Sequence, residues 1–88
     1  EVRMRAGASL ISESDVSMDF LLDERARELI GEEMRRFTLV RTGKLLERTR
    51  SFNSVSKALI KDHNVLWPVP QEVIDANSGL QWENNTGY

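Results

Sequence analysis

The sequence predicts a mainly α-helical fold, and three observations support this prediction. Apolar residues recur at three- and four-residue spacing over residues 18–41, which is the period of an α-helix. A shorter apolar pattern covers residues 44–63, and the alternation typical of strands is weak throughout the chain. Finally, Pro68 and Pro70 predict an extended ribbon, because each proline fixes its own φ and restricts the residue before it.

Length and composition exclude several classes of protein. The chain has 88 residues, which make one small domain or a segment of a larger protein. Its net charge of −2 argues against a nucleic-acid partner, which requires a concentrated basic face. The absence of cysteine excludes disulfides, thiolate nucleophiles and zinc sites built on cysteine. We therefore expect no metal site and no cofactor.

The first residues predict the end of a helix rather than the start of a domain. Residues 1–7 read as a last helical turn that closes on Gly7 as its C-cap, and residues 8–16 read as a polar loop. The chain also starts without an initiator methionine. We therefore expect residues 1–88 to be the C-terminal segment of a longer protein.

Residues 17–42 predict the main amphipathic helix. Ser17 is placed to cap its start, and Thr42 with Gly43 to end it. The apolar positions are expected to form a single stripe: Leu22, Ala26, Leu29, Ile30, Met34, Phe37 and Val40. The charged positions predict a solvated face with these candidate ion pairs: Glu24–Arg27, Glu28–Arg35, Glu32–Arg35 and Glu32–Arg36. All but Glu28–Arg35 have the three- or four-residue spacing that brings side chains together on a helix.

The rest of the chain predicts short elements. Residues 44–63 are expected to form shorter helices, interrupted at Asn53 and Ser54. Residues 64–88 are expected to form the Pro-x-Pro ribbon and the tail, with one turn of helix at Gln71–Asp75 and an irregular end.

Four short stretches occur in a fixed order along the chain. They are EVRMRAG at 1–7, DERARELIGE at 23–32, RRFTLVRTG at 35–43 and LWPVPQEVIDAN at 66–77, with Gly-Tyr closing the sequence. In this order and spacing they resemble the C-terminal region of the RagB/SusD family of outer-membrane nutrient-binding lipoproteins. The sequence departs from the family pattern where relatives usually have glycine, tryptophan, aspartate and proline: at Glu33, Arg36, Thr38 and Thr86.

The resemblance implies the C-terminal helical portion of a SusD-like, tetratricopeptide-containing α fold, with an irregular Pro-rich C-terminal tail. It implies part of a cell-surface protein that captures oligosaccharides for import through a TonB-dependent outer-membrane transporter of the SusC type. The oligosaccharide would be bound mainly by upstream residues, and an N-terminal lipid outside this segment would anchor the protein in the outer membrane. We therefore expect a mainly structural role for residues 1–88, and no enzymatic activity.

Aromatic residues are the candidate ligand contacts, because aromatic rings stack on the apolar faces of sugars. Trp82, in the polar tail, is the candidate for an exposed binding platform. Trp67 is expected to plug the core, and Tyr88 to dock the tail onto the body. His63 has no second ligand at metal spacing, so we expect it to form a hydrogen bond near the end of a short helix.

Two alternative functions belong to other classes of protein. One is a free-standing helical domain that binds a partner helix in a groove. The other is a small hydrolase that uses the helix carboxylates, which requires a carboxylate of strongly perturbed pKa in a cleft.

A local basic patch is expected to be a solvated helix face: Arg41, Lys44, Arg48 and Arg50. The SusD-like interpretation instead predicts exposed apolar surface on this segment.

Overall fold

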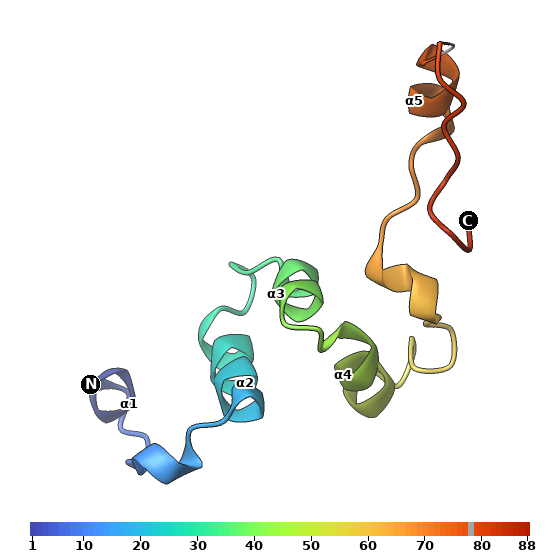
Figure 1. Cartoon of the computed structure of the whole chain (residues 1–88). Helices are drawn as coiled ribbons and strands as arrows, with labels where there is room; N and C mark the ends of the chain where they lie inside the picture. Colours follow the sequence, from blue (N-terminus) through green and yellow to red (C-terminus); the bar gives the residue numbers. More distant parts are fainter. Residues whose placement is uncertain (78) are drawn as a thin grey trace. The chain divides into compact units, whose positions relative to one another are not determined.

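The computed structural model describes residues 1–77 and 79–88. Its α-helices, labelled in Figure 1, are α1 Val2–Arg5, α2 Met18–Glu28, α3 Arg35–Arg41, α4 Leu45–Phe52 and α5 Gln71–Ala76. Two 3₁₀ turns lie at Glu13–Asp15 and Asp62–Val65. No strand occurs in these residues, and the mainly α-helical prediction is confirmed. The chain divides into two compact units, Glu1–Arg35 and Arg36–Tyr88.

In the first unit, α1 ends at a glycine as the sequence predicted. Gly7 has φ +69°, a left-handed conformation that costs glycine little. The Gly7 N–H donates to the Met4 carbonyl at 3.1 Å, and the Ala8 N–H donates to the Arg3 carbonyl at 2.8 Å. This pair of hydrogen bonds satisfies carbonyls that the helix end would otherwise leave open.

Ser17 caps the start of α2. Its backbone is extended, and its hydroxyl accepts a hydrogen bond from the Phe20 N–H at 3.1 Å. The predicted N-cap is therefore confirmed. On this helix Leu22 is the buried residue, with 1% of its surface exposed.

The expectation of one helix over residues 17–42 is wrong. The helix ends at Glu28, and a new one begins at Arg35. Between them Gly31 has φ +79°, and the N–H groups of Glu32 and Glu33 both donate to the Leu29 carbonyl at 3.1 Å. Glycine has low helix propensity and readily adopts positive φ, so the chain turns at Gly31 although the apolar period continues through it.

The single apolar stripe is lost with the single helix. Ile30, Met34 and Phe37 belong to the predicted stripe, yet their side chains are largely exposed. On α3 the buried residues are instead Thr38 and Leu39. The period of the apolar residues therefore indicated helix correctly but identified the buried face of α3 wrongly.

In the second unit, α3 ends at Arg41, and Gly43 closes the turn that follows it, as predicted. Gly43 has φ +69°, its N–H donates to the Val40 carbonyl at 3.0 Å, and the Lys44 N–H donates to the Leu39 carbonyl at 2.8 Å. This is the same glycine-terminated pattern as at α1. The short turn lets α4 follow almost at once.

After α4 the chain forms turns and then the second 3₁₀ turn, rather than a further α-helix of the kind expected within residues 44–63. The side-chain oxygen of Asn53 accepts hydrogen bonds from the N–H groups of Val55 at 3.1 Å and Ser56 at 2.8 Å. Asparagine side chains compete in this way with helical backbone pairing, which explains the break predicted at Asn53. An ion pair of 2.8 Å between Arg50 and Asp62 then links α4 to the second 3₁₀ turn.

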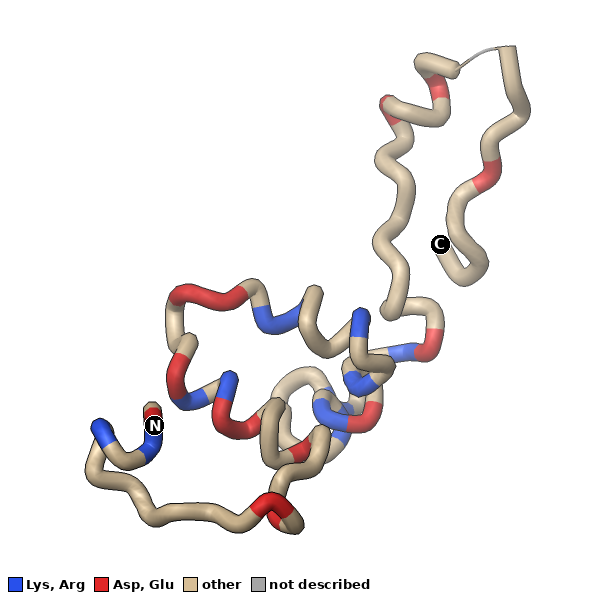
Figure 2. The backbone as a smooth tube through the Cα atoms, turned by 60° about the vertical axis from the view of Figure 1, so that its left-hand side comes forward, with Lys and Arg blue, Asp and Glu red and all other residues tan. Residues whose placement is uncertain are grey.

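The extended ribbon 66–70 leads into α5, which spans Gln71–Ala76 and contains the predicted turn. Beyond α5 the described tail returns beside the ribbon (Figure 1). All Lys and Arg residues lie within residues 1–61, so the last part of the chain carries acidic charges only, as Figure 2 shows.

The buried apolar core of the described residues is small. It consists of Leu22 in the first unit and of Leu39 and Leu45 in the second, whereas many large apolar side chains are exposed. Among the described helices, none combines the length and the apolar character that crossing a membrane requires.

Candidate functional site

The ribbon is held by side-chain amides of the tail. The Val69 N–H donates to the Asn84 side-chain oxygen at 2.8 Å, and the Asn84 amide nitrogen donates to the Val69 carbonyl at 3.1 Å. The Asn85 amide nitrogen donates to the Trp67 carbonyl at 2.6 Å. The prolines on both sides of Val69 have no N–H to donate, so the ribbon cannot pair regularly with a strand. The Asn84 side chain instead satisfies both the N–H and the carbonyl of Val69.

Tyr88 completes this contact. We call the contact the clasp; in it the tail residues Asn84, Asn85 and Tyr88 hold residues 66–69 of the ribbon. The Tyr88 hydroxyl donates to the Leu66 carbonyl at 3.0 Å and accepts from the Asn64 amide at 3.1 Å. The prediction that Tyr88 docks the tail onto the body is confirmed.

His63 lies against Tyr88. The two ring centroids are 4.7 Å apart with an edge-to-face angle of 71°. In the described residues its imidazole thus has this ring contact instead of the expected side-chain hydrogen bond. Gly87 has φ +101°, and a Cβ there would lie 2.5 Å from His63 Cγ, so only glycine fits between the ring and the tail.

Trp67 is not the core plug that the sequence suggested, because 62% of its surface is exposed. The Arg36 guanidinium lies over its ring, 4.6 Å from the centroid. The same guanidinium donates to the carbonyls of Asn64 and Leu66. Arg36 therefore fixes the start of the ribbon and covers one side of Trp67.

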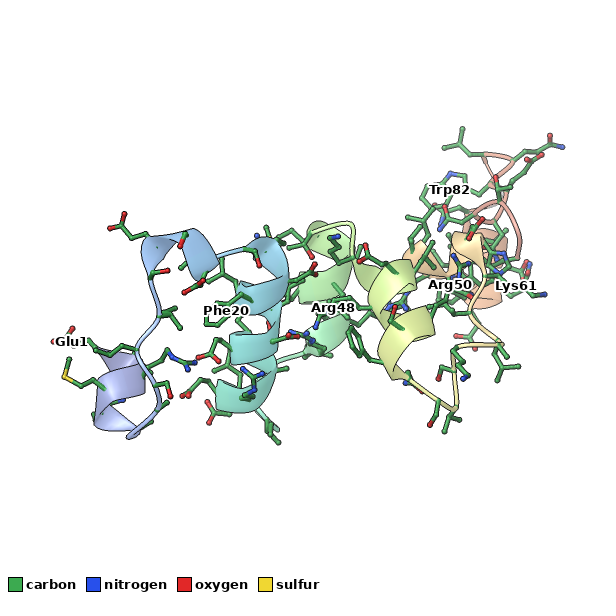
Figure 3. All side chains as sticks on the ribbon, turned by 90° about the horizontal axis from the view of Figure 1, so that it is seen from below. Glu1, Phe20, Arg48, Arg50, Lys61 and Trp82 are labelled. Carbon is green, nitrogen blue, oxygen red and sulfur yellow. The ribbon has the colours of Figure 1, made fainter. Side chains whose placement is uncertain are left out.

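Trp82, the predicted ligand contact, lies in the tail (Figure 3) and makes none of the hydrogen bonds of the clasp. Its side chain is 47% exposed. The structure therefore leaves part of the indole open but does not bring Trp82 together with Trp67 or Tyr88 through any contact that the described residues show.

The carboxylates of the first unit form ion pairs. Glu24 is paired with Arg3 at 2.7 Å and with Arg27, and the latter pair was predicted. The hydrogen bond from Arg3, aided by Arg27, lowers the pKa of Glu24 below its ordinary value, against a smaller opposing effect of desolvation. A lowered pKa keeps this carboxyl ionised, whereas a general acid needs a raised one.

The predicted pairs of Glu28 and Glu32 with Arg35 and Arg36 do not appear among the described ion pairs. Glu33 is the acceptor instead, with Arg25 donating to one of its oxygens at 2.7 and 3.1 Å. The turn at Gly31 changes the spacing, because the three- and four-residue rule holds only along a continuous helix.

The predicted basic patch is divided among different partners. Lys44 pairs with Glu47 at 2.7 Å, and Arg50 pairs with Asp62. Arg48, expected in solvent, is buried, and its guanidinium lies 4.9 Å from the Phe52 ring centroid. Within residues 1–77 and 79–88, no group of three or more His, Cys, Asp and Glu side chains is placed to hold a metal ion.

These features define a helical segment whose ribbon is clasped by its own tail. The SusD family model (SusD_RagB) matches residues 1–88, and the chain belongs to the SusD family. Members of this family are glycan-binding proteins of nutrient uptake rather than enzymes; they lie at the outer-membrane surface and generally pair with SusC-like transporters. The searches of curated proteins and of solved structures found no match to this chain.

Proposed function

We propose that this chain is part of a cell-surface protein that captures oligosaccharides for import through a TonB-dependent outer-membrane transporter. In this proposal an N-terminal lipid outside residues 1–88 anchors the protein, and the segment described here is mainly structural. The observation that supports the proposal is the match of the SusD family model over residues 1–88.

The structural role is supported by the amount of exposed apolar surface. Phe52, at the end of α4, and Val55, in the following turns, are both more than 70% exposed. Soluble proteins seldom leave large contiguous apolar patches open, so such side chains normally have a covering partner. We propose that other parts of the same protein cover them.

Trp82 is the proposed ligand contact within this segment. Its indole is half exposed and lies outside the clasp, so a sugar ring can reach it without disturbing the ribbon. No Lys or Arg follows Lys61 in the sequence, which suits a neutral ligand better than an anionic one.

The test uses the native protein, tagged at its C-terminus and extracted from outer membranes in mild detergent. We expect it to copurify with a β-barrel transporter, to carry an acylated N-terminal cysteine by intact mass, and to bind neutral oligosaccharides in calorimetry. A native protein without lipid or transporter would contradict the proposal and favour the free-standing helical domain.

The contribution of Trp82 is tested separately by calorimetry of Trp82→Ala, with Trp67→Ala as the matched control. Loss of one stacking contact is expected to weaken glycan affinity about fivefold, whereas Trp67→Ala leaves it unchanged. Equal affinities for the two variants would remove Trp82 from the ligand site without affecting the transporter assignment.

A further inference from the structure

A hollow of about 340 Å³ lies in the second unit, along α4 and the turns that follow it. One part of its lining is apolar, and the other part is polar, with Arg36 as its charged residue. The apolar part is Leu45, Leu59 and Ile60, and the polar part includes Thr49, Asn53 and Ser56. The volume is within the range of small-molecule sites in proteins, roughly 300–1,000 Å³.

The polar part keeps hydrogen-bonding groups that the described residues do not use. Asn53 commits its side-chain oxygen to the backbone N–H groups of Val55 and Ser56. Its amide nitrogen, and the hydroxyls of Thr49 and Ser56, have no hydrogen-bond partner among the described residues. A ligand with hydroxyl groups therefore finds donors and acceptors along this part of the lining.

The lining carries one charged residue and no carboxylate. That residue is Arg36, whose guanidinium already donates to the carbonyls of Asn64 and Leu66 and lies over the Trp67 ring. These partners are neutral, and the Arg36 Nε has no hydrogen-bond partner among the described residues. Apart from this single guanidinium the polar lining consists of hydroxyl and amide groups, so it fits a molecule with one hydroxyl-bearing edge and one apolar face.

We propose that this hollow binds one or two rings of a neutral sugar, as an auxiliary site separate from Trp82. The hydroxyl edge of the sugar faces Thr49, Asn53 and Ser56, and its C–H face packs against Leu59 and Ile60. The proposal rests on the proposed function, because it takes its ligand from the glycans that such a protein captures.

The test follows the Ile60 methyl group by NMR in the native protein, with its signal assigned through Ile60→Val. Titration with maltotriose, xylotriose and mannotriose is expected to shift this signal, whereas trigalacturonate leaves it in place. Thr49→Val and Ser56→Ala remove one hydroxyl each, and each is expected to weaken the local Kd about fivefold. The matched control is Lys57→Ala, an exposed neighbour that does not line the hollow.

Several outcomes would overturn the site. They are an Ile60 signal that no neutral sugar moves, a Kd unchanged in both variants, or a native protein in which another segment fills the hollow. None of these affects the proposed function, which is tested by the lipid, the transporter and total glycan binding. Conversely, loss of those three properties would remove the proposed function even if a sugar shifted the Ile60 signal.

Discussion

The hydroxyl of Tyr88 donates a hydrogen bond to the carbonyl of Leu66 at 3.0 Å, which joins two residues 22 positions apart. The Leu66 carbonyl also accepts a hydrogen bond from Arg36 at 3.3 Å. One backbone oxygen is therefore hydrogen-bonded both to a side chain of α3 and to a side chain of the tail. The ribbon of a SusD-family chain is thus fixed from two directions, although it forms no regular backbone pairing.

Tyr88→Phe is expected to open the clasp more often, because it removes a hydroxyl that makes two hydrogen bonds but keeps the ring against His63. A typical hydrogen bond contributes about 1 kcal/mol. Loss of one or both bonds should therefore make the Val69 amide, which donates to Asn84, exchange with deuterium about 5- to 30-fold faster. Unchanged protection of Val69 would show that Asn84 and Asn85 hold the tail without Tyr88.

Gly87→Ala is expected to release the tail, whereas Gly79→Ala is its matched control. At Gly87 the new Cβ meets the His63 ring at 2.5 Å and φ is +101°, but at Gly79 nothing lies within 4 Å and φ is not positive. We expect Gly87→Ala to cost about 1–3 kcal/mol in tail-opening free energy and Gly79→Ala almost nothing. Equal exchange of the Val69 amide in the two variants would contradict this.

Leu22→Ala and Leu21→Ala test which apolar side chains of α2 are buried. Leu22 is 1% exposed and its neighbour Leu21 is 46% exposed. Truncating a buried leucine costs about 2–5 kcal/mol, so Leu22→Ala should lower the free energy of unfolding by that amount. Leu21→Ala should lower it by less than about 1 kcal/mol. Urea denaturation followed by circular dichroism measures both, and similar losses would contradict the burial pattern.

The Arg3–Glu24 pair predicts a pH dependence. Its hydrogen bond holds the pKa of Glu24 below the ordinary value of 4.5. Because the folded-state pKa is the lower one, the stabilisation is fully present above the unfolded-state pKa and is lost as the pH falls through the folded-state pKa.

Carboxyl NMR titration checks this pair directly. Arg3→Gln should raise the Glu24 pKa toward its ordinary value, and Arg27→Gln should raise it less, because the Arg3 hydrogen bond is the largest of the causes. If Arg27→Gln had the larger effect, the assignment of Arg3 as the main partner would be wrong.

Several elements were predictable because they depend on neighbours a few residues away. The Ser17 cap and the glycine ends at Gly7 and Gly43 are closed by hydrogen bonds within six residues. The extended ribbon follows from the covalent restriction imposed by Pro68 and Pro70. The turn at Gly31 also has a local cause, the low helix propensity of glycine, but the apolar period of residues 17–42 carries no trace of it.

By itself, the sequence determined the helical class, the caps, the ribbon and the family, because each is written in short-range spacing or in motif order. The tertiary structure alone decided that Arg36 covers Trp67, that Arg48 is buried beside Phe52, and that Asn84 pairs with Val69. Two of these contacts, Arg36–Trp67 and Asn84–Val69, join residues far apart in the sequence. The burial of Arg48 depends on what packs around α4. None of these three features leaves a regular spacing in the sequence from which it could be predicted. The partner of a long polar side chain depends on where the backbone folds back.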